Sequence, residues 1–228
     1  MTDTLPILTL ASQSPRRREL LAPLAASLGY TLRLLPPDAD EDAEALEVVL
    51  PNEDPKEYVC RVTNLKAEAG WRRLLRKGFE PGPLIASDTT VVLGHEILGK
   101  PTDANDARRM LRALSNRTHH VLTAVTLLYP KDYERGESQQ GHAQHDVHKA
   151  FLLRQALSIS EVHFGYLSDD WIERVITSGE PMDKAGAYAI QGQAAAKIIE
   201  IKGSPSGVMG LPLFETSQLL ESLRQLGF

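Results

Sequence analysis

The sequence predicts an α/β fold with a mixed sheet. Short apolar segments typical of strands alternate with longer amphipathic segments typical of helices along most of the chain. Residues 84–93 form one such apolar segment. The tight turn at Gly94-His95 and the short return over 96–98 then indicate a hairpin, so at least one strand pair is antiparallel. A chain of 228 residues with ordinary apolar content suits one domain, 1–228, that buries a sizeable core.

Capping residues predict where the helices begin. Ser14 followed by Pro15 is typical of an N-cap and a first helical position, and Gly29 ends that helix. Asp54 with Glu57 three residues later has the spacing of a capping box and begins a second helix. Helices are expected over 14–29, 103–114, 168–179 and 212–226, and another is expected to begin at 54.

Apolar and β-branched runs predict the strands, and two polar stretches interrupt them. The stretch 36–55 is acidic and loop-like. The stretch 129–149 is long for a loop and is expected to be a surface excursion of the domain. Its three histidines are spaced by three, which would spread them around a helix, and no carboxylate pattern accompanies them, so we expect no metal site there. Strands are expected over 7–11, 31–35, 84–93, 96–98, 120–128, 156–166 and 196–201.

The composition excludes several classes of protein. The formal net charge of −5 at pH 7 argues against a long nucleic acid as partner, because proteins that hold one usually carry a basic excess. No apolar run approaches the roughly 20 residues that a membrane span needs, and residues 1–10 lack the basic start of a signal peptide. Cys60 is the only cysteine, so no internal disulfide is possible and a reducing cytoplasm is expected.

Basic residues are clustered at 16–18 and 72–77 although the chain is acidic, which suits a small polyanion in a cleft. The first cluster follows Ser12 where a strand leads into a helix, and free N–H groups and the helix dipole attract an anion at such a place. Arginines bind phosphate oxygens in a bidentate fork. Ser12, Arg16 and Arg17 therefore form either a phosphate site or a solvated basic helix start. For 72–77, a solvated helix end is the preferred interpretation.

Three further charged residues are candidates for the same site. Asp88 interrupts the apolar strand 84–93, so its carboxylate must be paired, metal-bound or exposed in a cleft. The hairpin that follows could return Lys100 to its neighbourhood, either as a structural ion pair or as part of a phosphate and metal site. Lys66 falls on the flank of the apolar face of its helix, from which it either reaches water or reaches into a cleft.

Two loop segments also carry candidate residues. Asp40-Glu41 follows a strand and two prolines and, taken alone, is typical of a solvated loop. The run 183–192 is rich in small residues that let the backbone approach a ligand. Gln191 within it has both a donor and an acceptor, which can read the edge of a pyrimidine. A simple glycine-rich turn is the alternative interpretation of that run.

Six motifs span nearly the whole chain and are specific in combination. They are LASQSPRR at 10–17, SDTTVV at 87–92, ILGKP at 97–101, SNRTH at 115–119, GEPMDKAGAY at 179–188 and VMGLP at 208–212. In this order and wording they resemble the Maf family. The resemblance implies a two-lobed α/β fold around a deep cleft, similar to the inosine triphosphate pyrophosphatases. It also implies a nucleotide pyrophosphatase, often homodimeric, that depends on a divalent metal such as Mg²⁺ or Mn²⁺.

The resemblance further implies roles for individual residues. Asp88 matches the proposed catalytic base and Glu41 the cleft acid, and these two carboxylates are the expected metal ligands. Lys100 is expected to complete the catalytic set. The residues that match phosphate-binding positions are Ser12, Arg16, Arg17 and Lys100, and Lys66 matches the cleft lysine, which is expected to bind substrate. The residues that match positions tied to substrate choice are Arg16, Thr89 and Gln191.

Two of the motifs resemble one branch of the family. Asp-Thr at 88–89 and AYAIQG at 187–192 are similar to the branch that hydrolyses dTTP and UTP to the monophosphate and pyrophosphate, which would clear non-standard or excess pyrimidine nucleotides. We expect this reaction. The alternatives are a nucleotide-binding regulator of cell division without catalysis, and the sister specificity for 7-methyl-GTP. The departures from the family pattern are Gly94-His95 in place of Asp-Gly, Pro205 in place of an aromatic residue, and the excursion at 129–149.

Overall fold

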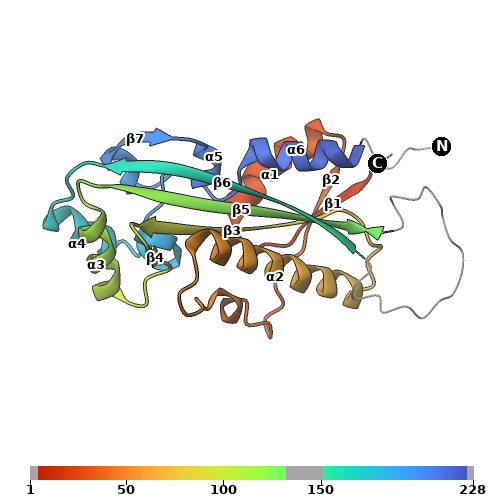
Figure 1. Ribbon diagram of the computed structural model, residues 1–228, viewed down its shortest axis with the longest axis horizontal. Coiled ribbons are helices and arrows are strands. Elements are labelled where there is room, and N and C mark those ends of the chain that lie inside the picture. Colours follow the sequence, from red (N-terminus) through yellow and green to blue (C-terminus); the bar gives the residue numbers. More distant parts are fainter. Residues whose placement is uncertain (1–4, 132–150, 225–228) are drawn as a thin grey trace, which may run out of the picture.

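A seven-stranded mixed sheet organises the part of the chain that the computed structural model describes, residues 5–131 and 151–224 (Figure 1). The strand order is β2-β1-β3-β5-β6-β7, and β4 pairs with β3 beside this path. β1 (Ile7–Leu10) lies parallel to β2 (Thr31–Leu34) and to β3 (Leu84–Leu93). The other pairs are antiparallel. The expected α/β class with a mixed sheet is therefore confirmed.

The strands β5 (Thr118–Pro130) and β6 (Phe151–Phe164) are longer than expected and pair along their whole length. The expectation of a loop from residue 129 is wrong at its first two positions, because Tyr129, only 1% exposed, and the proline after it continue β5. β6 starts earlier than expected because its first residues pair with β5. The sequence did not predict this start, because the polar residues Arg154 and Gln155 interrupt the apolar pattern. The rest of the excursion, with its three histidines, lies outside the described residues.

The remaining two strands are short. β4 (Glu96–Leu98) returns along β3 after a turn at Gly94, whose φ of 64° is a conformation that glycine adopts easily. The hairpin expected from this segment is thus confirmed. β7 (Ile198–Lys202) lies at the opposite edge of the sheet and pairs with β6, with a register shift at its start.

Helices cover both faces of the sheet at the end that carries β1 and β2. α1 (Pro15–Ser27) and α6 (Leu213–Arg224) lie on one face, and α2 (Pro55–Arg76) lies on the other (Figure 1). The hydroxyl of Ser14 caps α1 by accepting a hydrogen bond from the amide of Arg17. Asp54 caps α2 through the amide of the second residue after it. Both helix starts were expected from the sequence.

Hydrophobic clusters fill the space between the sheet and these helices. Side chains alternate along a strand, so the neighbours Ile85 and Ala86 pack on opposite faces. The cluster under α1 and α6 includes Leu10, Leu21, Ile85, Val125, Leu220 and Leu223. The cluster under α2 includes Ala67, Trp71, Leu74, Leu84, Ala86 and Leu128. Burying a leucine of this kind stabilises the fold by about 1.5–3 kcal/mol.

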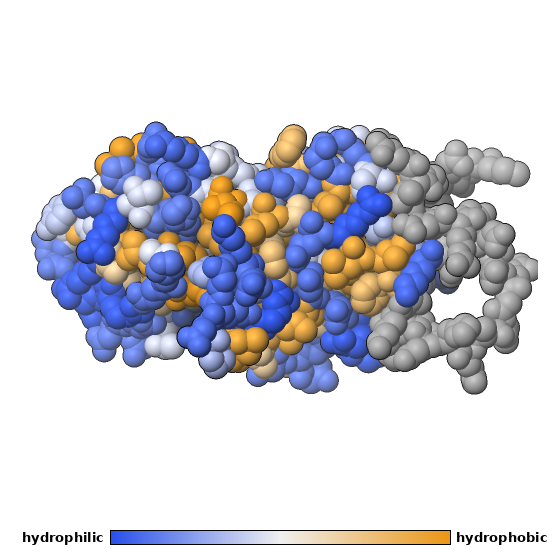
Figure 2. Space-filling view, in the orientation of Figure 1, coloured by the Kyte–Doolittle hydropathy of each residue, from blue (hydrophilic) through white to orange (hydrophobic). Residues whose placement is uncertain are grey.

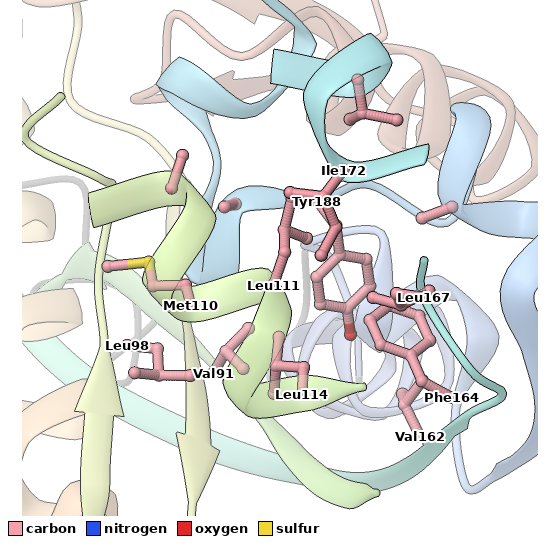
Figure 3. Packing of buried hydrophobic residues seen from close by; sticks show 14 of the residues in the cluster. Val91, Leu98, Met110, Leu111, Leu114, Val162, Phe164, Leu167, Ile172 and Tyr188 are labelled. Carbon is pink, nitrogen blue, oxygen red and sulfur yellow. The ribbon is translucent and has the colours of Figure 1, made fainter. Parts of the chain in front are cut away.

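A second lobe is built on the other end of the long strands. It contains α3 (Ala104–Leu114) and α4 (Asp169–Thr177), which lie together at that end (Figure 1). Figure 3 shows its core, in which both helices pack against the end of β6 and against a tyrosine from a later loop; the labelled residues include Leu111, Leu114, Phe164, Ile172 and Tyr188. The two lobes share β3, β5 and β6, so the expected two-lobed arrangement is confirmed.

Short helical turns follow the second lobe. Three are 3-10 turns: η4 (Glu180–Asp183), η5 (Ala185–Ala187) and η6 (Gln193–Lys197). The fourth, α5 (Pro205–Val208), begins with the proline that departs from the family pattern. Proline is tolerated there, because the first helical position needs no N–H donor.

The surface of the described residues is mixed in character. Figure 2 shows mainly hydrophilic residues over the end that carries α3 and α4, and hydrophobic residues in the band of surface between α2 and α6. Among the helices of the described ranges, none has the combined length and apolar content required to cross a membrane.

One glycine lets α2 approach the loop that follows β1. Gly70 is buried on α2, and a Cβ placed there would lie 2.5 Å from the Cβ of Ala11. Neither atom is the far end of a flexible side chain, so the contact has little room to relax. Lys66 lies one helical turn before Gly70, and Ser12 follows Ala11, so this contact sets the distance between two segments that carry candidate site residues.

We expect Gly70→Ala to lower the free energy of unfolding by about 1–3 kcal/mol, the usual cost of overpacking a core. Urea unfolding of the variant measures this change. The double variant Gly70→Ala/Ala11→Gly removes the opposing Cβ and should recover part of the loss relative to the sum of the two single changes. A Gly70→Ala protein as stable as the wild type would show that the helix and the loop are free to separate.

Candidate active site

A cleft of about 830 Å³ lies between the two lobes. Its walls come from the β1–α1 loop, the acidic segment after β2, α2, β3, the loop after β4 and the segment 182–191. Nine residues were expected at the site from the sequence, and all nine line this one cleft: Ser12, Arg16, Arg17, Glu41, Lys66, Asp88, Thr89, Lys100 and Gln191. The fold therefore gathers residues separated by as much as 179 positions into one place.

The N-terminal end of α1 forms one wall of the cleft. The hydroxyl of Ser12 accepts a hydrogen bond from the amide of Ser14 at 3.1 Å, which fixes the loop between β1 and α1. Arg16 lines the cleft, and its guanidinium makes no hydrogen bond to any residue in the described ranges. Its guanidinium is therefore available to an anion in front of the helix, where the helix dipole also favours negative charge.

Arg17 connects three parts of the cleft wall. Its Nε donates to the carbonyl of Gly210 at 2.9 Å, and its Nη2 donates to the hydroxyl of Thr89 at 3.4 Å. Loss of water around the guanidinium lowers its pKa, and the carboxylates of Asp88 and Glu47 act in the opposite direction. Arg17 therefore holds α1, β3 and the turn after α5 together in addition to adding positive charge to the cleft.

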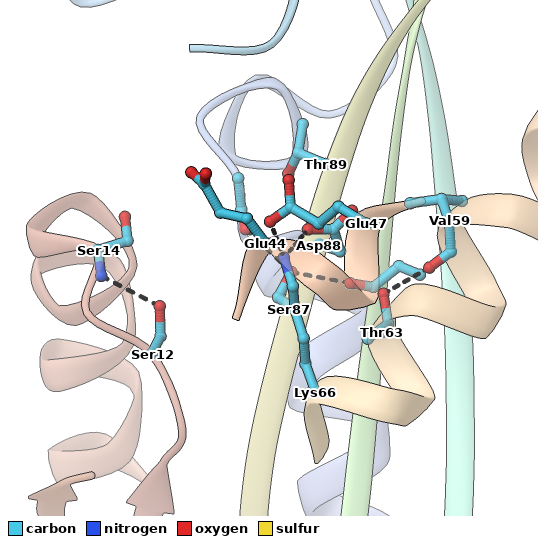
Figure 4. Close-up of polar contacts among 12 residues, drawn as sticks. Ser12, Ser14, Glu44, Glu47, Val59, Thr63, Lys66, Ser87, Asp88 and Thr89 are labelled. Atoms are coloured by element: carbon cyan, nitrogen blue, oxygen red, sulfur yellow. Dashed lines mark hydrogen bonds and ion pairs between the residues drawn. The ribbon is translucent and has the colours of Figure 1, made fainter. Parts of the chain in front are cut away.

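A lysine lies between two carboxylates at the centre of the site (Figure 4). The Nζ of Lys66, on α2, lies 2.6 Å from Oδ1 of Asp88 on β3 and 2.6 Å from Oε1 of Glu47. The side chain of Asp88 is only 9% exposed and that of Lys66 only 17% exposed. The mid-strand carboxylate is thus paired inside the cleft, as its position in an apolar strand requires.

The hairpin returns Lys100 to the cleft, where its partners are two glutamates. Its Nζ lies 3.1 Å from Oε1 of Glu44 and 3.3 Å from Oε2 of Glu47. Burial would lower the pKa of Lys100, but the two carboxylates outweigh it and the pKa is raised. Burial likewise works against the ionisation of Glu47, yet Lys66 and Lys100 outweigh it and its pKa is lowered. Lys100 and Glu47 are therefore both charged at neutral pH.

The acidic segment after β2 contains the residue that the sequence analysis missed, Glu47. The segment forms a 3-10 helix, η1 (Glu44–Glu47). Residues three apart lie nearly one above the other in such a helix, so both glutamates face the cleft lysines. The hydroxyl of Tyr58 donates to the backbone carbonyl of Glu47 at 3.0 Å and holds η1 against α2. The Glu-x-x-Glu spacing in a segment expected to be a loop was the only signal available from the sequence.

Glu41 lies at another part of the cleft wall, where two arginines bind it. Arg73 makes a bidentate contact with its carboxylate, and Arg76 also donates to it. Hydrogen bonds from these arginines, led by Arg73, hold the pKa of Glu41 below its usual value. Arg73 is only 3% exposed and also donates to the carbonyl of Leu35 at 3.1 Å. The expectation that all of 72–77 is a solvated helix end is therefore wrong for Arg73.

The segment that carries Gln191 forms the opposite rim. Gly186 has a φ of 67°, and a Cβ there would lie 2.9 Å from Val91, so only glycine fits against β3. Glu180 accepts hydrogen bonds from the amide of Gln193 at 3.1 and 3.3 Å, which fixes the turn just after Gln191. Gln191 itself is exposed at the rim and lines the cleft, where a ligand can reach it.

A buried histidine supports this rim from behind. Nε2 of His119 lies 2.7 Å from the hydroxyl of Tyr188, whose side chain also lines the cleft. His119 is fully buried between Tyr188 and Phe164. Burial, with a smaller effect of the adjacent His120, lowers the pKa of His119 to about 4. The imidazole is therefore neutral at physiological pH.

These features define a class of protein: an α/β protein with a cleft that gathers lysines, arginines and ionised carboxylates around one mid-strand aspartate, as a site for a phosphorylated small molecule requires. Comparison with known proteins is consistent with this class. Residues 7–223 match the family described as Maf-like protein. The chain belongs to this family.

Several relatives that carry the name dTTP/UTP pyrophosphatase are similar to this chain over almost their whole length. The protein from Albidiferax ferrireducens is 54% identical over 93% of this chain and 94% of its own. Those from Ralstonia nicotianae and Cupriavidus pinatubonensis are 53% and 52% identical and cover 94% and 95% of this chain, and 93% and 96% of their own. A solved HAM1 protein from Coxiella burnetii aligns at 14% identity with a TM-score of 0.44, covering 96% of this chain and 100% of that one.

The buried histidine generates a prediction on pH. At pH values between about 6.5 and 4, the unfolded chain binds a proton on His119 that the folded protein does not bind. Stability is therefore expected to fall as the pH falls through this window, by up to about 1.4 kcal/mol per pH unit from this group. Above pH 6.5 both states are neutral at this position and the penalty disappears.

The comparison that isolates this effect is His119→Gln, in which the side chain keeps an amide near Tyr188 but does not titrate. Chemical unfolding at several pH values should give a shallower decline for the variant, although it is less stable at pH 7. Parallel curves for the two proteins between pH 6.5 and 4 would mean that His119 titrates normally in the folded state.

Proposed function

We propose that the protein is a nucleoside triphosphate pyrophosphatase that hydrolyses dTTP and UTP to the monophosphate and pyrophosphate. The observation that carries the proposal is the pair formed by Asp88 and Lys66 within a cleft that also contains Arg16, Arg17 and Lys100. The names of relatives that are 52–54% identical over more than nine-tenths of the chain support the same substrates.

In the proposed reaction, Asp88 accepts a proton from the attacking water. The water oxygen bonds to the α-phosphorus as the bond to the bridging oxygen of the leaving pyrophosphate breaks. Asp88 suits this role because its carboxylate forms an ion pair with Lys66 yet is only 9% exposed, so bulk water does not compete for the position.

The cations of the cleft would bind the triphosphate. The guanidinium of Arg16 at the start of α1 makes no hydrogen bond or salt bridge among the described residues, although it lies close enough to Asp183 to act against burial and lower the pKa of that carboxyl. Lys66 and Lys100 would exchange their glutamate partners for phosphate oxygens. Together with Arg17 they would offset the charge that develops on the departing pyrophosphate. Thr89 and Gln191 line the part of the cleft that remains for the nucleoside.

A divalent cation, Mg²⁺ or Mn²⁺, belongs to this proposal, because carboxylate and phosphate oxygens are the ligands these ions prefer. Such a metal acts as a Lewis acid on the phosphate oxygens. Asp88 is the first protein ligand proposed. Glu41 was the second carboxylate expected from the family resemblance, but its oxygens are already shared by Arg73 and Arg76, which reduces what it can offer to a metal.

Two further properties are part of the proposal. The free thiol of Cys60 is half-buried, and loss of water raises its pKa, which suits a reducing cytoplasm. The family resemblance also implies a homodimer, and light scattering of the purified protein measures that state directly.

The first test is the reaction itself. With Mg²⁺ or Mn²⁺, the purified protein is expected to convert UTP and dTTP to the monophosphate and pyrophosphate, with product analysis by ion-exchange chromatography. Release of orthophosphate in place of pyrophosphate would contradict the proposal, and a clear preference for 7-methyl-GTP would assign the sister specificity. Binding of UTP without any turnover would support the regulator without catalysis instead.

The second test is Asp88→Asn, which keeps the shape of the side chain and an acceptor for Lys66 but removes the proton-accepting group. We expect a folded protein whose kcat is lower by roughly 10²-fold or more, the usual scale for a positioned base. Thermal melting and UTP titration separate this outcome from a loss of stability or of binding.

The matched control for that test is Glu96→Gln, an exposed pair with Arg109 outside the cleft. This variant removes one carboxylate in the same way and should leave kcat unchanged. Near-normal turnover in a well-folded Asp88→Asn protein would rule out the role of Asp88 as the base.

A further inference from the structure

The ammonium of Lys66 occupies the position of a cation between two carboxylates from different segments. Asp88 projects from β3 and Glu47 from η1, and one oxygen of each lies 2.6 Å from the same nitrogen (Figure 4). The two oxygens therefore converge on a single point. Convergent carboxylates of this kind repel one another unless a cation lies between them.

Glu47 is held in this position by more than its charge. Tyr58 donates a hydrogen bond to the backbone carbonyl of Glu47, so η1 is anchored to α2 independently of the ion pairs. The side chain of Glu47 is 25% exposed, whereas that of its neighbour Glu44 is 76% exposed. Glu47 is therefore the member of the Glu-x-x-Glu pair that reaches the interior of the cleft.

An unpartnered hydroxyl lies on the same side of β3 as Asp88. Thr90 is two residues further along the strand, and alternate residues share one face. It lines the cleft, is 2% exposed, and its Oγ1 makes no hydrogen bond to any residue between 5 and 131 or between 151 and 224. A buried hydroxyl without a partner costs about 1–3 kcal/mol, so this one indicates a ligand or a bound water that the protein atoms do not supply.

We propose that Glu47, together with Asp88, binds the divalent cation, and that the hydroxyl of Thr90 hydrogen-bonds to a water in the shell of that ion. The proposal rests on the proposed function and names a ligand that the family resemblance did not. Mg²⁺ is usually held by one or two carboxylates plus substrate phosphates, and it keeps several waters. Asp88, Glu47 and Thr90 supply such a set.

Binding of the metal ion in place of the Lys66 ammonium would also give Lys66 a second position. A divalent cation between Asp88 and Glu47 balances both carboxylates, so the ammonium of Lys66 is no longer needed there. Lys66 then turns its charge toward the phosphate oxygens of the substrate. Without substrate the lysine prevents repulsion between the two carboxylates, and with metal and substrate it neutralises the triphosphate.

Glu41 does not take this place. Its carboxylate already accepts hydrogen bonds from Arg73 and Arg76, and removing it would leave the 3% exposed guanidinium of Arg73 without its carboxylate. Glu41 therefore stabilises the cleft wall, and Glu47 carries the metal-binding role expected earlier for Glu41.

The experiment measures Mn²⁺ binding directly, without turnover. The free Mn²⁺ signal in electron paramagnetic resonance is titrated with the full-length protein in the presence of α,β-methylene-UTP, which is not hydrolysed at the relevant bond. Glu47→Gln is expected to weaken Mn²⁺ binding by roughly tenfold or more, since even outer partners of metal ligands change affinity by 10–100-fold. Thermal melting confirms that the variant is folded.

The control variant is Glu44→Gln, which removes the exposed glutamate of the same turn and should bind Mn²⁺ as the wild type does. Glu41→Gln is the competing assignment, and its affinity for Mn²⁺ should also be unchanged. Loss of affinity in Glu41→Gln with none in Glu47→Gln would overturn the proposal. So would unchanged Mn²⁺ affinity in Glu47→Gln with a lower KM for UTP, because Glu47 would then merely compete with phosphate for the lysines.

Failure of the proposed function has a different signature. If the wild-type protein binds Mn²⁺ through Glu47 but releases pyrophosphate from neither UTP nor dTTP, the proposed metal site is supported and the proposed reaction is contradicted. If the wild-type protein hydrolyses UTP while Glu47→Gln retains full Mn²⁺ affinity, the proposed reaction is supported and the proposed metal site is contradicted.

Discussion

The balance of charge inside the cleft is the constraint on which the rest of the structure depends. The site needs several cations to hold a triphosphate, yet half-buried cations are costly unless anions lie beside them. The acidic segment between β2 and α2 supplies these anions: Glu47 lies against Lys66, Glu44 against Lys100, and Glu41 against Arg73. A segment that resembles an ordinary loop in the sequence therefore keeps the site folded while no substrate is bound.

The strand β3 divides the site between the two faces of the sheet. Asp88 points toward Lys66 on α2, and its neighbour Thr89 points toward Arg17 on α1, because successive side chains leave a strand on opposite sides. The hydroxyls of Thr123 on β5 and Thr89 are also hydrogen-bonded to each other. Asp88 can thus take part in the proposed reaction while Thr89 helps to position the cleft wall, and neither residue disturbs the contacts of the other.

Short sequence patterns correctly predicted the helix starts and the hairpin turn, because these features depend mainly on residues that are neighbours in the sequence. Ser14 and Asp54 cap helices as expected, and Gly94 turns the hairpin. The motifs predicted residues that the fold gathers into one cleft. The partners of Glu41, the burial of Arg73 and the place of Glu47 could not be predicted, because they depend on contacts between α2 and a segment more than ten residues away in sequence. The residues of family motifs are visible in a sequence; the counter-charges that hold them are not.

The close contact between Gly70 and Ala11 has a consequence for how a ligand would be held. Because Gly70 has no Cβ, the backbone of α2 packs directly against Ala11, and a Cβ at Gly70 would lie only 2.5 Å from the Cβ of Ala11. The β1–α1 loop and the turn of α2 that carries Lys66 are therefore packed directly together in one lobe, whereas the segment that leads to Gln191 packs into the core of the other lobe with α3 and α4. A ligand that contacts both Lys66 and Gln191 would therefore join the two lobes across the cleft.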